Sequence, residues 1–155
     1  MNLIKMKRNS KQKFDRIIGR VRNKKACGII YSVPPPLTLS EVNKMLEEHE
    51  ILALDGEDAC TYRRLYFWLS TKCGVPSMKA EMLPAALNGR MLTIYNADFI
   101  SSDYTRVLHD CAKNNVPLLL ILRTKEPLEK IRHFDCYNKI LTIEQDYSEF
   151  LTTKI

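Results

Sequence analysis

The segment Ser32–Leu39 (SVPPPLTL) has the length of a phosphate-binding loop but not its residues. It lies between an apolar run at residues 26–31 and a stretch with helical periodicity, so a strand, an eight-residue loop and a helix are expected in succession. A loop of the form G-x-x-x-x-G-K-[ST] needs glycines, so that backbone amides converge on the phosphates, and a lysine for charge. The corresponding positions here are Ser32, Leu37, Thr38 and Leu39.

The three consecutive prolines Pro34, Pro35 and Pro36 make the loop still less suited to phosphate. They remove three N–H donors and fix three φ angles. No lysine stands between Lys25 and Lys44. We therefore expect a rigid loop that does not bind nucleotide, and no cofactor.

The segment Leu92–Ile100 (LTIYNADFI) is similar to the strand that carries the acidic pair of an ATPase. In that role an Asp organises Mg²⁺ and a Glu activates water, and both tasks need an anionic side chain. Here Tyr95 and Asn96 occupy the two positions, and Asp98 stands further along. We expect no catalytic residue and no metal, only a degenerate nucleotide site made of Ser32, Leu37, Thr38, Leu39, Tyr95 and Asn96.

Strand-like and helix-like sequence patterns alternate along the chain, and the elements that they predict would position these residues. Apolar runs predict strands at residues 26–31, 51–54, 91–95, 116–122 and 139–143. Helical patterns occupy residues 10–22, 38–49, 58–73, 77–88, 102–115, 127–133 and 147–152. Short apolar strands without polar alternation are typical of parallel sheets buried on both faces. The fold class is therefore α/β, with a five-stranded, mostly parallel, doubly wound sheet.

Four aromatic residues lie in the helix expected at residues 58–73. We expect Tyr62, Tyr66 and Phe67 to pack in the core, and Trp68 to be exposed as an anchor for a partner.

The formal net charge of +6 is concentrated at the N-terminus. Residues 1–25 hold a single acid, Asp15, and ten basic residues, which give a local net charge of +9: Lys5, Lys7, Arg8, Lys11, Lys13, Arg16, Arg20, Arg22, Lys24 and Lys25. The other 130 residues hold fourteen basic and seventeen acidic residues, a net of −3. We expect a basic N-terminal arm and helix at 1–25 and a single core at 26–155. The arm is predicted to bind nucleic acid through phosphates; a solubilising tail and contact with an acidic protein or a membrane surface are the alternatives.

The five cysteines stand singly and form no C-x-x-C pair, a distribution typical of a reducing cytoplasm. No apolar run approaches the roughly 18–20 residues that span a bilayer, so no membrane-spanning segment is expected, and a membrane is not the expected partner. The predicted localisation is cytoplasmic.

Four segments together resemble the P-loop NTPase core of the AAA+ class, the RecA/AAA-like fold, from about Ala26 to Thr152. They are ACGIIYSVPPPLTLSEV, GRMLTIYNADFIS, NNVPLLLILRT and CYNKILTI. The resemblance is closer to the transposition-regulator branch, which includes the phage Mu transposition ATPase and TniB-type transposon proteins. It implies a polar sensor position at Arg123 or Thr124, and the helical lid of the family has no counterpart in these 155 residues.

The degenerate site and the basic arm lead to one principal function prediction. The chain is expected to be a non-hydrolysing AAA-like module, a pseudo-ATPase rather than an enzyme. It would bind nucleic acid through its arm and act with a partner protein such as an active ATPase or a transposase. The alternative is a scaffold or inhibitor that mimics an ATPase subunit without binding nucleic acid. An enzyme of unrelated chemistry, with a metabolite near Ser32, Asp55 and Asp98, is a third possibility.

Overall fold

Parallel strands and helices alternate in the computed structural model, which describes residues 15–16, 18–23, 27–31, 39–48, 50–122 and 140–141. The strands are β1 (Cys27–Tyr31), β2 (Ile51–Asp55), β3 (Met91–Tyr95), β4 (Leu118–Leu122) and β5 (Ile140–Leu141). The sheet order is β2-β3-β4-β1-β5, and the neighbouring strands pair in parallel. The predicted α/β class with a parallel sheet is confirmed.

Each of the following helices lies within a predicted segment but begins later or ends earlier than predicted. They are α2 (Leu39–Glu48), α3 (Tyr62–Cys73), α4 (Leu83–Leu87) and α5 (Thr105–Lys113), with 3₁₀ turns η1 (Ala80–Met82), η2 (Ala97–Phe99) and η3 (Ser102–Tyr104). Residues 15–16 and 18–23 are also helical. The helices predicted at 127–133 and 147–152 lie outside the described residues.

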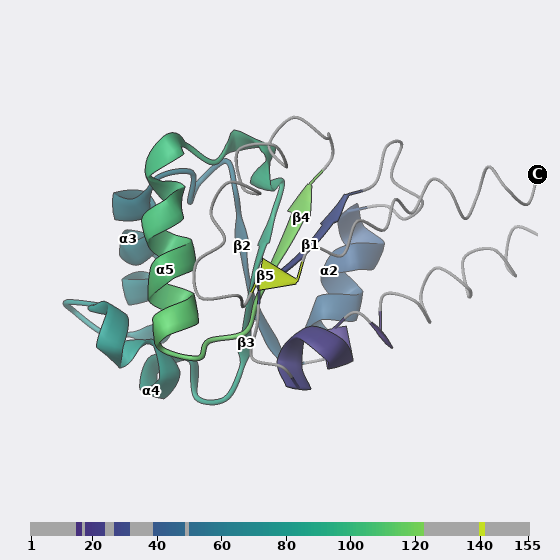
Figure 1. The fold of residues 1–155 in the computed structure, drawn as a ribbon, viewed down its shortest axis with the longest axis horizontal. Coiled ribbons are helices and arrows are strands. Elements are labelled where there is room, and N and C mark those ends of the chain that lie inside the picture. Colours follow the sequence, from purple (N-terminus) through teal and green to yellow (C-terminus); the bar gives the residue numbers. More distant parts are fainter. Residues whose placement is uncertain are drawn as a thin grey trace, which may run out of the picture.

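The helices cover both faces of the sheet (Figure 1), as right-handed crossovers in opposite directions require. The chain moves from β1 to the far edge strand β2 through α2, and then returns through β3 to β4. Because the direction of travel reverses after β2, α3, α4 and α5 lie on the face opposite α2. No helix of the described residues is long and apolar enough to cross a membrane.

The core has two layers that use alternate residues of the central strands. Toward α3, α4 and α5, strand residues such as Leu92, Ile94 and Leu120 join one buried cluster. The alternating residues Met91 and Leu119 are fully buried on the other face. Burial on both faces of β3 and β4 is thus as predicted. Strand β2 alternates between buried and half-buried residues because it forms the edge of the sheet.

Helix α3 begins at Tyr62 and not at the predicted Asp58, because the residues before it form a turn on the end of β2. The carbonyl of Asp55 accepts the amides of Asp58 and Ala59 at 3.0 and 2.9 Å. Thr61 then caps the helix, its hydroxyl oxygen accepting from the Arg64 amide at 3.1 Å. Side-chain capping of this kind competes with helix extension.

The burial expected for two aromatic residues of α3 is wrong. Phe67 is 62% exposed, whereas Trp68 is half-buried and packs against the core. Leu65 and Leu69 are the buried residues of the helix. At about 100° per residue, Phe67 lies about 200° from Leu65 and so points away from the core. Trp68 lies on the flank of the buried stripe, so its indole covers the edge of the core.

Candidate functional site

Two residues of the degenerate nucleotide site, Tyr95 and Asn96, lie at the carboxyl end of the parallel sheet. Tyr95 ends β3 in register with Asp55, which ends β2, and Asn96 follows in the left-handed region at φ 51°. In open α/β sheets this is the edge at which ligands bind. The other members of the predicted site lie outside the described residues, apart from Leu39, which begins α2.

A network of short contacts joins the ends of β2 and β3. The Gly56 amide donates to the Tyr95 carbonyl at 2.6 Å. The Asp55 carboxylate accepts from the Glu57 amide at 2.9 Å and from Asn96 Nδ2 at 3.3 Å. The carboxylate of Asp55 and the amide of Asn96 thus hold each other in place.

Tyr95 is a neutral phenol at physiological pH. Burial raises its pKa above 10.0, and the negative charges of Asp55 and Asp58 raise it further. The end of β3 therefore presents a neutral phenol and a neutral amide where the resemblance implies two carboxylates. Among the described residues no group of three His, Cys, Asp or Glu side chains could hold a metal ion.

The predicted basic site is described only in its helical part. Arg16 and Arg20 are exposed. Arg22 is half-buried, and its Nη2 donates to the Glu50 carbonyl at 2.9 Å, so this guanidinium ties the helix to the turn before β2. The remaining basic residues of the site lie outside the described residues: Lys5, Lys7, Arg8, Lys11, Lys13, Lys24 and Lys25.

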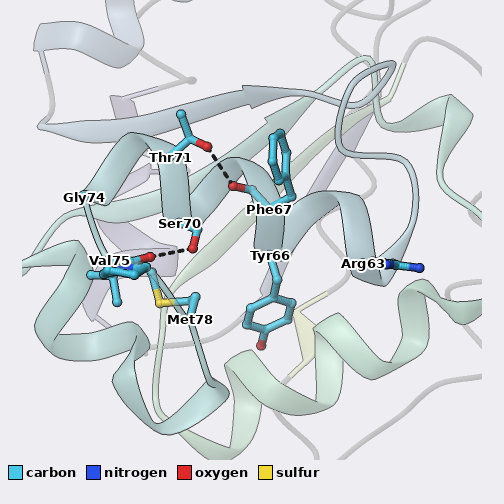
Figure 2. A pocket seen from close by; sticks show the side chains of 9 residues that line it. Arg63, Tyr66, Phe67, Ser70, Thr71, Gly74, Val75 and Met78 are labelled. Atoms are coloured by element: carbon cyan, nitrogen blue, oxygen red, sulfur yellow. Dashed lines mark hydrogen bonds between the residues drawn. The ribbon is translucent and has the colours of Figure 1, made fainter.

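A hollow of about 570 Å³, which was not predicted from the sequence, lies between α3 and the loop at residues 74–78. We call it the α3 groove; Figure 2 shows the side chains that line it. Its members include Arg63, Phe67, Val75 and Met78. Two sequence signals could have found it: the position of Phe67 opposite Leu65, and the lack of any acid between residues 59 and 80.

A polar cluster on the same helix links α3 to α5. Asp110 Oδ2 accepts the hydroxyls of Tyr62 at 2.9 Å and of Tyr66 at 2.6 Å. The Arg106 guanidinium lies 4.1 Å from the centre of the Tyr62 ring. Because its carboxylate is used in this way, Asp110 serves packing between two helices.

No protein-family model matches the chain, and no curated protein is detectably similar in sequence. Solved structures of Drosophila ORC, an AAA+ ATPase complex, do match. ORC bound to AT-rich DNA and Cdc6 superposes with a TM-score of 0.58 at 11% identity, over 97% of this chain and 31% of that chain. ORC bound to GC-rich DNA and Cdc6 gives 0.56 at 14% identity, over 96% and 30%. ORC bound to DNA gives 0.56 at 13%, over 94% and 31%.

The chain spans less than a third of the length of the ORC chains it matches. At these identities the likeness concerns the fold alone. With the parallel order β2-β3-β4-β1-β5, it supports an AAA+/P-loop-like fold for this chain.

Proposed function

We propose that this chain is a non-hydrolysing AAA-like module that binds nucleic acid through its basic N-terminal arm and acts with a partner protein. The observation that carries the proposal is the separation of charge, ten basic residues and one acid in residues 1–25 against a net of −3 in the rest. The exposure of Arg16 and Arg20 is consistent with it. The matching ORC structures are described as bound to DNA, two of them also to Cdc6.

The proposal includes the absence of ATPase chemistry and a relationship to transposition regulators. Tyr95 and Asn96 supply no negative charge for Mg²⁺ or for activating water. We propose a complete five-stranded RecA/AAA-like core with a basic N-terminal helix, kinship with transposition regulators of mobile elements, and a cytoplasmic location. An active ATPase or a transposase would be the partner.

Filter binding to duplex DNA over a salt series tests the arm. Deletion of residues 1–25 would remove Ile18 and Val21, which are buried in the core. The test therefore uses the full chain with seven basic residues changed to Gln: Lys5, Lys7, Arg8, Lys11, Lys13, Arg16 and Arg20. Arg22 is kept because its guanidinium bonds to Glu50.

The slope of log K against log[salt] is the decisive quantity, because each neutralised phosphate contributes about −0.9. The seven changes should weaken binding and reduce the magnitude of the slope by up to about 6. Lys44→Gln with Lys113→Gln removes exposed charge from α2 and α5 and should change the slope little. No binding at low salt, or equal slopes for all variants, would contradict the proposal.

A specific observation favours the second candidate function, a protein-interaction scaffold without nucleic-acid binding. The α3 groove and the exposed Phe67 offer a contact surface far in sequence from the arm. If the salt series finds no binding to DNA or RNA while the groove binds a protein segment, the scaffold function replaces the first proposal.

A further inference from the structure

The α3 groove is formed by one stripe of a helix and the loop that follows it. Arg63, Phe67 and Ser70 share a side of α3 because they are spaced i, i+4 and i+7. Gly74 adopts a φ of 67° at the end of the helix, which lets the chain turn back. In Figure 2, Met78 lies beside Ser70, and this loop forms the second wall of the hollow.

Hydrogen bonds fix the groove before any partner arrives. The Val75 amide donates to the Ser70 carbonyl at 3.0 Å, and Ser70 Oγ donates back to the Val75 carbonyl. Thr71 Oγ1 donates to the Phe67 carbonyl at 3.0 Å. Both hydroxyls are thus used within the groove wall, and a partner would not have to order this loop on binding.

Phe67 stands at the rim as a rigid aromatic side chain. It is 62% exposed, and its ring and that of Trp68 pack in a T-shaped arrangement, with centroids 5.7 Å apart at an angle of 79°. Trp68 in turn packs against the core. A large aromatic held in this way beside a hollow is typical of residues that dominate binding energy at protein interfaces.

The segment that forms the groove is positively charged although the body of the chain is net negative. Residues 59–80 contain no acid and four basic residues, all exposed: Arg63, Arg64, Lys72 and Lys79. Arg63 lines the groove itself, and Lys79 directly follows Met78. Arg64 precedes Thr71 by seven residues and so shares its side of the helix.

We propose that the α3 groove is the docking site for an acidic segment of a partner protein. An apolar side chain of that segment would enter the hollow beside Phe67, Val75 and Met78. Its carboxylates would face Arg63 and Arg64. The proposal deepens the partner-binding part of the proposed function, on which it rests, but it does not require the arm to bind nucleic acid.

The shape of the groove favours a protein segment over a nucleic-acid strand. Single strands are bound by successive aromatic platforms along a charged track. Here Phe67 is the one exposed aromatic ring on the described α3, and the facing wall is formed by Val75, Pro76 and Met78. Such a hollow accepts a leucine-sized side chain, while the arginines favour acidic side chains around it.

Fluorescence anisotropy with synthetic peptides tests the groove. The probe is an acidic peptide of about 14 residues with two leucines one helical turn apart. One comparison peptide replaces its acids by lysine, and a second replaces its leucines by serine. The full chain should bind the acidic leucine peptide at least about tenfold more tightly than either comparison peptide.

Variants locate the binding. Phe67→Ala, and separately Arg63→Glu with Arg64→Glu, should each weaken binding of the acidic probe about tenfold or more. Phe99→Ala is the matched control, since Phe99 is 56% exposed on η2, and it should leave binding unchanged. Melting temperatures of all variants establish that the fold is kept. The arm variant with seven Gln substitutions should still bind the probe, which separates failure of this proposal from failure of nucleic-acid binding.

Three results would overturn the proposal. The first is equal binding of the acidic, basic and serine peptides, or binding of none. The second is an equal effect of Phe67→Ala and Phe99→Ala. The third is a single-stranded oligothymidine that competes with the probe and loses affinity on Phe67→Ala, because the groove would then be a nucleic-acid site.

Discussion

Gly56 is the residue at which the carboxyl edge of the sheet tolerates least change. A Cβ built on Gly56 would lie 2.2 Å from the Asn96 carbonyl oxygen and 3.0 Å from that of Tyr95. Both atoms belong to the backbone, so neither can rotate away. Any side chain here must push apart the ends of β2 and β3 and break the hydrogen bond from the Gly56 amide to Tyr95.

Gly56→Ala should therefore lower the free energy of unfolding by about 1–3 kcal/mol, the usual cost of overpacking. Urea denaturation measures it. Gly19→Ala is the matched control, because a Cβ at this helical glycine meets nothing within 4 Å. That change should stabilise by about 0.5–1 kcal/mol through helix propensity. A Gly56→Ala protein as stable as the unchanged chain would disprove the close approach to Asn96.

Some properties of single residues could be predicted from the sequence, and others could not. The neutral side chains at Tyr95 and Asn96 could be predicted, because a strand pattern aligns them with positions that need acids. The need for glycine at position 56 could not, since it depends on the register Asp55↔Tyr95 between two strands 40 residues apart. Sequence periodicity predicts strands but does not report their relative register.

At the scale of elements, the contact between α3 and α5 depends on two tyrosines that must stay protonated. Burial raises the pKa of Tyr66 far above 10.0, and its hydrogen bond to Asp110 raises it further. The same two causes, in the same order, raise the pKa of Tyr62. An ionised phenol could not donate to the carboxylate and would repel it.

The stability of the chain should consequently fall in alkali. Below about pH 10 both states keep the phenol protons, and the full stabilisation is present. As the pH rises above the unfolded value of 10.0, the unfolded state loses these protons first, so the free energy of unfolding decreases. Tyr66→Phe should make this decrease smaller, and Tyr62→Phe should do so to a lesser extent. Urea denaturation at pH 8 and above pH 10 measures this decrease in the free energy of unfolding. An equal decrease for Tyr66→Phe and for the unchanged chain would refute the prediction.

Helix α3 also shows what apolar periodicity can and cannot predict about an element. Leu65 and Leu69 are buried, as the i, i+4 spacing of an apolar helix face requires. Phe67 was assigned to the core by its residue type, although its angular position on the helix points outward. The helices after it are shorter than predicted because 3₁₀ turns precede α4 and α5. Apolar periodicity does not distinguish a 3₁₀ turn from the first turn of an α-helix.

At the scale of the whole molecule, alternating elements were sufficient to predict the α/β class and the parallel sheet. The order β2-β3-β4-β1-β5 was not derivable, since short apolar strands carry no label for their neighbours. The groove beside α3 was not derivable either, because it depends on how the chain turns at Gly74. The charge separation, in contrast, is a property of the sequence and was visible without a structure.

The proposed loss of nucleotide binding is a property of the whole sheet edge, and a thermal shift tests it. A ligand that binds only the native state raises stability by RT ln(1 + [L]/Kd). At about 1 mM ATP, a site with a Kd of about 0.1 mM would add about 1.4 kcal/mol. In a chain of this size that raises Tm by about 3 °C, well within detection. We expect no such rise with ATP and Mg²⁺, because Tyr95 and Asn96 supply no negative charge for the metal and Ser32–Leu39 lacks the glycines and the lysine.

The basic arm complicates this measurement, since ATP is itself a polyanion that lysines and arginines attract. The variant with seven Gln substitutions removes that contribution, and Mg²⁺ alone controls for the metal. A rise in Tm that disappears in the arm variant would assign the binding to the arm and leave the sheet edge without nucleotide. A rise that persists in the arm variant would mean that the carboxyl edge still binds ATP, and the module would then be a nucleotide-responsive one.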